Sequence, residues 1–440
     1  MNLPKCTEYK DSGIPWIGRI PAEWAVLPLL GIASERAEPN IGMRQDNLLS
    51  LSYGRIVRKD IQANDGLLPE SFETYQIISA GDIVLRLTDL QNDKRSLRSA
   101  LVEEQGIITS AYVAIHPTKV EPRFLAYLLR AYDLNKVFYS MGGGLRQSMK
   151  FADMKRMPMV IPGDEEQADI VAFLDRETGK IDALIAEQEK LLILLAEKRR
   201  AAISHAVTRG LNPEAPVRDS RTGWLGRIPA HWSITRLKYA ASLIVDCPHE
   251  TPIYDDEGPY KVIRTADTYE GVLDASRIYK VNEAEYRNRI RRQALAKGDI
   301  VYGREGERWG FAAQVPESDS YCLGQRMMQF RAAPSICPRY LMWQLNAFST
   351  YRQGQMDTVG ATSPHVNVST IRNYVLAEPP AAEQAEISAF LDAETDKLDG
   401  LKAHAERAIE LLRERRSALI TTAVTGKIRV RNAAPQELAA

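Results

Sequence analysis

The second half of this chain repeats part of the first half, and the repeat constrains the fold more than any other feature. Residues 162–208 align with residues 379–425 without a gap, and the shift is 217 positions at both ends. A shorter repeat opens each half, with WIGRIPAEW at residues 16–24 and WLGRIPAHW at residues 224–232. Between these matched segments the two halves differ almost completely. A constant frame with different inserts indicates one scaffold that presents two different binding surfaces.

The longer repeat has the residue pattern of a coiled-coil helix. Its apolar residues recur at heptad spacing, with charged residues on the other faces. Polar residues interrupt the apolar seam of both copies, which favours a short or irregular coiled coil. The seam and its interruptions are Leu174, Ile181, Leu195 and Ala202 with Gln188 and Arg199 in the first copy, and Leu391, Leu398, Leu412 and Leu419 with Lys402 and Arg416 in the second.

Start and stop signals bound each predicted helix. Pro162 and Pro379 precede acidic first turns, which suit the positive end of a helix dipole. Gly210 and Gly426 follow the two segments, as glycine commonly does at a helix end. A helix of about 43 residues is roughly 65 Å long. Because each helix is polar outside its seam, it needs a partner, and the other copy has the matching seam.

The two inserts, about residues 10–160 and 218–378, have the pattern of mixed α/β structure. Each contains the sequence Gly-Asp-Ile-Val, at residues 81–84 and 298–301, again 217 positions apart. We expect each to be a turn that leads into a buried strand. A helix with proline at its start follows in each insert, from Pro122 and from Pro338.

Composition bounds the function less sharply. The 57 basic and 57 acidic residues give zero net charge, which argues mildly against a nucleic-acid binder judged by bulk charge. The charges are segregated, however, because basic residues cluster in the inserts and acids gather where the repeated helices begin. Such segregation can still place a basic surface against phosphates. No apolar run reaches the roughly 18 residues of a membrane span and no signal peptide is evident, so we expect a cytoplasmic protein.

No catalytic or metal-binding motif is recognisable. The four cysteines are scattered singly and form no ligand cluster with the six histidines, so we expect no bound metal. An amino-methyltransferase needs an Asn/Asp-Pro-Pro-aromatic motif, and the nearest string is EPPA at residues 378–381. The phosphate-binding pattern Gly-x-x-x-x-Gly-Lys-Ser/Thr is also lacking. We therefore expect no catalytic residue and no cofactor in this chain.

The order of these segments resembles the specificity (S) subunit of type I restriction-modification systems. In that family a variable domain precedes a Pro-x-x-x-Glu-Gln helix that ends in Ala-Val-Thr, and both then recur. The residues that carry the resemblance are Pro162, Glu166, Gln167, Phe173, Leu174, Asp175 and residues 206–208 in the first copy, and Pro379, Glu383, Gln384, Phe390, Leu391, Asp392 and residues 423–425 in the second. The resemblance covers nearly the whole chain.

The resemblance implies an α/β (α+β) fold, with two pseudo-repeated target recognition domains separated by two long antiparallel coiled-coil helices. The expected segments are target recognition domain 1 at residues 1–161, coiled-coil helix 1 at 162–210, target recognition domain 2 at 211–378, coiled-coil helix 2 at 379–427 and a flexible C-terminal tail at 428–440.

The implied function is recognition of double-stranded DNA without catalysis. Each domain would read one half of a bipartite target, and because the inserts differ, that target would be asymmetric. The helices would dock two modification (methyltransferase) subunits, joined in restriction by two motor-nuclease subunits. Those partner subunits would bind S-adenosylmethionine, ATP and Mg²⁺.

Basic and amide side chains near equivalent turns of the two inserts are the candidates for DNA contact. Arginine suits guanine and an amide side chain suits adenine, whereas a run of cations suits phosphates. Glycine-rich residues 142–144 permit a phosphate loop, a plain turn before a helix, or a turn that grips DNA phosphates. For many candidates a solvated charged loop is an equally good interpretation. The candidates are Arg86, Lys94, Arg95, Arg98, Arg146, Gln147, Lys150, Arg289, Arg291, Arg292, Arg304, Arg308, Gln325, Arg326, His365 and Asn367.

The expected subunit-docking surface is centred on Phe173, Leu174, Phe390 and Leu391, although these four residues also suit a helix–helix core. A structural coiled-coil scaffold with two protein- or ligand-binding domains is the alternative function, and it predicts no salt-dependent DNA binding. A nuclease is the weakest alternative, since it would need metal-dependent cleavage by this chain alone.

Overall fold

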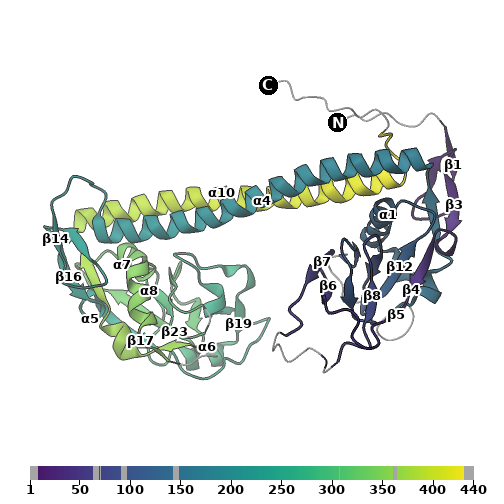
Figure 1. Cartoon of the computed structure of the whole chain (residues 1–440). Helices are drawn as coiled ribbons and strands as arrows, with labels where there is room; N and C mark the ends of the chain where they lie inside the picture. Colours follow the sequence, from purple (N-terminus) through teal and green to yellow (C-terminus); the bar gives the residue numbers. More distant parts are fainter. Residues whose placement is uncertain are drawn as a thin grey trace. The chain divides into compact units, whose positions relative to one another are not determined.

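The computed structural model describes residues 8–62, 69, 71–90, 97–141, 148–306, 308–359 and 364–430 (Figure 1). The chain divides into two compact units: unit 1 holds residues 1–188 and 407–440, and unit 2 holds residues 189–406. The two long helices are α4 (Asp164–Arg209) and α10 (Ala381–Val424). Unit 1 contains the start of α4 and the end of α10, and unit 2 contains the end of α4 and the start of α10. The predicted fold, with two mixed α/β domains and two long helices, is confirmed.

Unit 1 is built on a four-stranded antiparallel sheet of order β10-β9-β12-β4 and a three-stranded sheet of order β11-β8-β5. Pairs β13-β3, β1-β2 and β6-β7 complete it. The elements are β1 (Tyr9–Asp11), β2 (Arg19–Pro21), β3 (Ala25–Pro28), 3₁₀ helix η1 (Leu29–Gly31), β4 (Ala33–Arg36), β5 (Glu38–Pro39), β6 (Leu49–Ser52), β7 (Arg55–Arg58), β8 (Gln76–Ile78), β9 (Ile83–Leu85), β10 (Ser99–Leu101), β11 (Gly106–Ile108), β12 (Val113–Pro117), α1 (Pro122–Leu134), α2 (Val137–Met141), α3 (Phe151–Met154) and β13 (Pro158–Ile161).

Unit 2 has the same plan, with a four-stranded antiparallel sheet of order β21-β20-β23-β17 and a three-stranded sheet of order β19-β18-β22. Its elements are β14 (Val217–Asp219), β15 (Arg227–Pro229), β16 (Ser233–Arg236), α5 (Leu237–Ala240), β17 (Ala241–Asp246), β18 (Tyr260–Ile263), η3 (Thr265–Asp267), η4 (Ala275–Arg277), β19 (Tyr279–Val281), α6 (Glu283–Arg289), β20 (Ile300–Gly303), β21 (Ala312–Gln314), β22 (Tyr321–Leu323), β23 (Met327–Ala332), α7 (Pro338–Leu345), α8 (Phe348–Gln355), β24 (Thr358–Val359), β25 (His365–Val366), α9 (Val368–Arg372) and β26 (Val375–Glu378).

The repeated Gly-Asp-Ile-Val sequences lead into buried strands, as predicted. In β9, Ile83 and Leu85 pack on the side of α1 and the long helices, and Val84 packs on the opposite side. Both faces of the strand are covered, which explains its unbroken apolar run. The preceding carboxylates are buried as well: Asp82 accepts the backbone N–H of Ser79 at 2.8 Å, and Asp299 accepts that of Ala296 at 2.8 Å.

Two of the four polar residues that interrupt the helical seams, Arg199 and Arg416, form ion pairs between α4 and α10. In unit 1, Arg416 Nε lies 3.1 Å from Asp182 Oδ1. In unit 2, Arg199 Nη1 lies 2.9 Å from Asp399 Oδ1. Both residues of one pair are 217 positions from their counterparts in the other, so the repeat places the same ion pair in both units. Because each unit pairs an early segment of one helix with a late segment of the other, the helices run antiparallel.

The short opening repeats and the Glu-Gln pairs are explained by packing. Trp24 Nε1 donates to Glu166 Oε2 at 3.0 Å in unit 1, and Trp232 Nε1 donates to Glu383 Oε2 at 2.9 Å in unit 2. Gly426 lies against Trp24 and Gly210 against Trp232. Each tryptophan therefore holds the start of one long helix beside the end of the other.

Among the residues that the structure describes, no helix is both long and apolar enough to cross a membrane.

Candidate nucleic-acid interface

In the first domain, Arg86 follows strand β9 directly and its side chain is exposed. Arg98 is buried instead, and its guanidinium donates to the carbonyl oxygens of Arg86, Thr88 and Asp89. Arg98 therefore shapes the turn that carries Arg86 and does not itself face solvent. The exposed Lys150 is near this turn, because the backbone N–H of Met149 donates to the Leu87 carbonyl at 2.9 Å. Lys94, Arg95, Arg146 and Gln147 lie outside the described residues.

In the second domain, the three neighbouring arginines of the 289–292 segment differ in role. Arg289 is buried and donates to the carbonyls of Pro248, Glu250 and Leu323 at 3.2, 2.7 and 2.9 Å. Arg292 donates to the Asp246 carbonyl at 2.9 Å. Arg291 is exposed and contacts Asn288. Arg289 and Arg292 therefore fix the backbone of the 246–250 loop, a role that their clustering in the sequence does not indicate.

Arg304 follows strand β20 directly, yet it is buried in an ionic network. Its Nε is 3.2 Å from Asp246 Oδ1, and its Nη2 is 2.7 Å from Glu305 Oε1. Its backbone N–H donates to the Arg326 carbonyl at 3.0 Å, and its carbonyl accepts the N–H of Val366 at 3.1 Å. These bonds bring the Arg326 and His365 segments beside Arg304.

The remaining candidates of this domain are distributed around that network. Arg326 is exposed, and its guanidinium has no hydrogen-bond or ion-pair partner among the described residues. Arg308 is exposed and donates to the Tyr269 hydroxyl at 3.0 Å. Gln325 and His365 are half-buried, and Asn367 is exposed at the start of α9.

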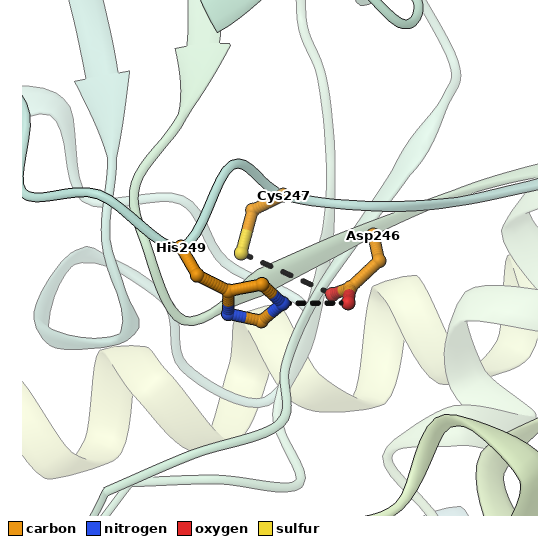
Figure 2. A group of neighbouring side chains, drawn as sticks. All are labelled: Asp246, Cys247 and His249. Atoms are coloured by element: carbon orange, nitrogen blue, oxygen red, sulfur yellow. Dashed lines mark hydrogen bonds and ion pairs between the residues drawn. The ribbon is translucent and has the colours of Figure 1, made fainter.

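The structure adds a cluster that the sequence reading missed: Asp246, Cys247 and His249 (Figure 2). His249 Nε2 lies 2.9 Å from Asp246 Oδ2, and the Cys247 thiol lies 3.9 Å from Asp246 Oδ1. The string Asp-Cys-Pro-His at residues 246–249 was the available signal.

The donor set of Asp246, Cys247 and His249 does not fit a metal. Arg304 Nη2 lies 3.3 Å from His249 Nε2, so a guanidinium already occupies the side of the cluster where a cation would bind. Burial raises the pKa of the Cys247 thiol to about 11.

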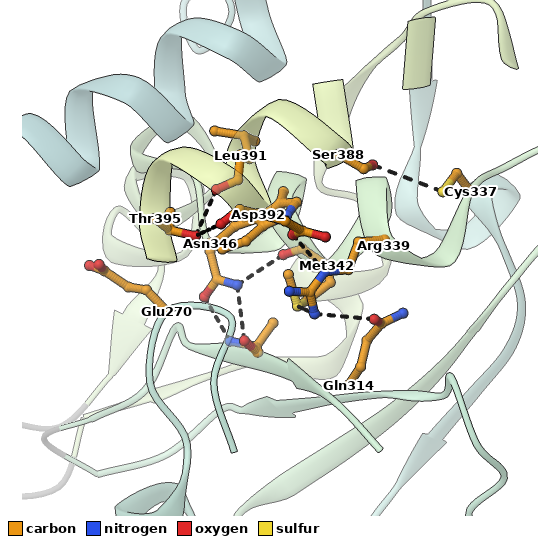
Figure 3. Close-up of polar contacts among 12 residues, drawn as sticks. Glu270, Gln314, Cys337, Arg339, Met342, Asn346, Ser388, Leu391, Asp392 and Thr395 are labelled. Atoms are coloured by element: carbon orange, nitrogen blue, oxygen red, sulfur yellow. Dashed lines mark hydrogen bonds and ion pairs between the residues drawn. The ribbon is translucent and has the colours of Figure 1, made fainter. Parts of the chain in front are cut away.

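A second set of contacts fixes each recognition domain to a long helix. In unit 2, Arg339 Nε and Trp343 Nε1 both contact Asp392 Oδ1, at 2.8 and 2.9 Å (Figure 3). In unit 1, Tyr127 donates its hydroxyl to Asp175 at 2.8 Å, and Arg123 pairs with the same carboxylate at 2.8 Å. The repeated aspartates 175 and 392 therefore bind the equivalent helices α1 and α7 of their own domains.

The four predicted docking residues are divided by burial. Phe173, Leu174 and Leu391 lie in the cores of their units, as the helix–helix alternative describes. Phe390 is exposed on α10. Other apolar side chains of the long helices are exposed, among them Leu184 and Leu194 of α4 and Leu401 and Leu411 of α10.

Comparison with known proteins gives a consistent result. A family model described as "Type I restriction modification DNA specificity domain" matches residues 248–411. The type I restriction enzyme MjaX specificity subunit of Methanocaldococcus jannaschii is 21% identical over 94% of this chain and 96% of its own length. The type I restriction enzyme EcoKI specificity subunit of Escherichia coli K12 is 20% identical over 93% of this chain and 90% of its own length.

One similar solved structure comes from work on complex assembly and conformational transition of the type I R-M system. It has a TM-score of 0.68 at 16% identity and covers 92% of this chain and 98% of the solved one. At that identity the likeness shows the fold alone. The family model, the near full-length relatives and the duplicated architecture agree: this chain is similar to the specificity subunits of type I restriction-modification systems, and its residues 248–411 match the DNA specificity domain of that family.

Proposed function

We propose that this chain reads a bipartite, asymmetric double-stranded DNA target and carries two modification subunits, joined in restriction by two motor-nuclease subunits. The observation that carries the proposal is the duplicated frame. Both units tie a four-stranded sheet to the long helices through the same tryptophan, glutamate and aspartate contacts. The loops that leave this frame differ, so the two domains would read different half-sites.

The polar surfaces of the two domains differ in chemistry as well as in sequence. The first domain presents the exposed cations Arg86 and Lys150 on neighbouring segments. The second presents His249 and Arg326 around the buried Arg304. Free guanidinium and ammonium groups would contact phosphates and fix the register on the duplex, whereas oriented side chains would contact base edges. Two such unlike surfaces support an asymmetric target.

We further propose that the modification subunits dock on exposed leucines of the long helices. Leu184 of α4 and Leu411 of α10 are both exposed in unit 1, at 51% and 48%. Leu194 of α4 and Leu401 of α10 are both exposed in unit 2, at 51% and 43%. The repeat relates these pairs, since Leu184 and Leu401, like Leu194 and Leu411, are 217 positions apart. Two equivalent pairs of exposed leucines suit two copies of one partner, because apolar side chains exposed on a surface are candidates for an interface.

The chemistry would belong to the partners. S-adenosylmethionine would be bound by the modification subunits, and ATP and Mg²⁺ by the motor-nuclease subunits, all in the cytoplasm. Methylation of a base inside the duplex would require that base to be flipped out of the stack, at a cost of a few kcal/mol offset by the bound complex.

Methylation mapping tests this proposal directly. The chain is expressed with the modification subunit encoded beside it, and methylated positions in host DNA are located by long-read sequencing. A split motif with two unlike halves is expected. An assembled complex that methylates no split motif would instead favour a structural scaffold with two protein- or ligand-binding domains.

A further inference from the structure

One half-exposed histidine of unit 2 sits on a buried ionic network. His249 Nε2 contacts Asp246 Oδ2 at 2.9 Å and Arg304 Nη2 at 3.3 Å (Figure 2 shows the first contact). The side chain of His249 is 50% exposed, whereas those of Asp246 and Arg304 are 21% and 10% exposed. The imidazole is therefore held from beneath by fixed groups and still reaches solvent.

The network beneath His249 is not needed to fill the domain core. Arg304 pairs with Asp246 and Glu305 and also donates to the Val366 carbonyl at 3.3 Å. Buried ion pairs are often no more stabilising than apolar side chains of equal volume. An ionic network at the ends of strands β17 and β20 is therefore better explained by the orientation that Asp246 and Arg304 give to His249. Functional side chains are commonly fixed by such supporting contacts.

The surroundings of His249 suit a polyanion. Arg292 approaches from one side through its bond to the Asp246 carbonyl at 2.9 Å. The segments of Arg326 and His365 lie beside Arg304, because the Arg304 N–H donates to the Arg326 carbonyl and the Val366 N–H donates to the Arg304 carbonyl. A Cβ at Gly306 would lie 3.1 Å from Arg326 Nη1, so this guanidinium, which has no partner in the described part of the chain, is close to the 304–306 turn. Phosphates on either side of a base would meet these cations.

We propose that His249 is a specificity-determining residue that reads a base edge in the half-site of the second domain. The inference rests on the proposed DNA recognition and deepens it. Asp246 engages Nε2, which fixes the ring orientation, as a carboxylate commonly does for histidine. Among the described residues, Nδ1 has one contact, to Arg304 Nη2 at the long distance of 3.5 Å. In the tautomer whose Nε2–H donates to Asp246, Nδ1 is the hydrogen-bond acceptor, so its partner would be the amino group of adenine or cytosine in the major groove.

The test compares four full-length variants, each expressed with the modification subunit: His249→Ala, His249→Asn, Asp246→Asn and His231→Ala. The motif is mapped by methylation sequencing, and affinity is measured by competition with duplexes mutated at single base pairs. His249→Ala should relax the base preference at one position of the second half-site and lower the affinity for the wild-type duplex roughly 10- to 100-fold. The base preferences of the first half-site should not change. His249→Asn keeps a polar atom near Nδ1 and should retain part of the preference. Asp246→Asn should relax the base preference at the same position, but less than His249→Ala does.

His231→Ala is the matched control, since His231 is also a half-exposed histidine of unit 2 paired with a carboxylate, with Nε2 2.5 Å from Glu383 Oε1. It should leave both half-sites as in the wild type. A His249→Ala protein with the wild-type motif and affinity overturns the inference, whether or not its thermal stability falls. That result is distinct from failure of the proposed function, in which the wild-type complex itself methylates no split motif.

Discussion

Trp24 and Glu166 are joined by a hydrogen bond of 3.0 Å between side chains that are both buried, although 142 residues separate them in the chain. The same bond recurs between Trp232 and Glu383. The carboxylate of Glu383 is more exposed and also contacts His231. The two copies of one motif therefore have equal geometry and unequal burial, which gives a direct prediction.

Trp24→Phe should destabilise its unit more than Trp232→Phe. Loss of the indole N–H leaves Glu166 with a buried, unsatisfied oxygen, at a cost of about 1–3 kcal/mol. Glu383 keeps its histidine partner and access to water, so we expect about 1 kcal/mol or less there. Urea unfolding of both variants, followed by tryptophan fluorescence and circular dichroism, measures the difference. Equal losses would show that burial does not distinguish the two motifs.

Arg199→Met should cost more stability than Arg416→Met. Arg199 is 11% exposed, pairs with Asp399 and Glu270, and donates to the Glu270 carbonyl at 2.7 Å. Arg416 is 32% exposed. Arg199 is only partly buried and Asp399 is 48% exposed, so the loss at Arg199 should be about 1–3 kcal/mol, whereas more exposed pairs contribute about 1 kcal/mol or less. Methionine keeps much of the chain length, so thermal unfolding reports the lost charge. A larger effect at Arg416 would contradict this ranking.

Cys247 gives a pH-dependent prediction. Burial, followed by the neighbouring Asp246, raises the pKa of its thiol to about 11. The unfolded thiol titrates near pH 8.5, so its contribution to stability is complete below that pH and is lost as the pH rises towards 11. The free energy of unfolding should fall by at most about 3 kcal/mol over this pH range. The free energy of unfolding of Cys247→Ala should depend less on pH between 8.5 and 11 than that of the wild type. An unchanged dependence on pH would contradict the raised pKa of this thiol.

Arg326→Ala should weaken DNA binding by the assembled complex without altering the motif. A guanidinium with no partner among the described residues is suited to a phosphate, so its loss should lower the slope of log affinity against log salt by about 1. Arg287 is an exposed arginine of α6 paired with Glu283, and Arg287→Ala is the control. Equal slopes for Arg326→Ala and the wild type would remove Arg326 from the proposed interface.

Much of the fold could be predicted because repetition reveals contacts that a single copy hides. The 217-residue shift identified the long helices and the Gly-Asp-Ile-Val strands, and a proline at the start of each indicated the helices from Pro122 and Pro338; the structure contains all of them. The register of α4 against α10 was harder to predict from the sequence. It depends on Arg199 and Arg416, whose partners lie on the other helix.

The candidate site was less predictable because charge does not reveal exposure. Arg289 and Arg304 have the composition of a DNA-binding loop, but their guanidinium groups bind carbonyls and carboxylates that lie 39 and 58 positions away. His249 was missed because its significance depends on Asp246 and on Arg304, which only the fold brings together. Local sequence gave the residue types, and long-range pairing decided which of them reach solvent.

The most direct test of the central claim is methylation mapping of a chimaera in which residues 211–378 are replaced by a second copy of the first recognition domain. If each domain reads its own half-site, the wild type methylates a split asymmetric motif and the chimaera methylates a split motif with two identical halves. A chimaera that assembles with the modification subunit and retains the wild-type motif would contradict the account.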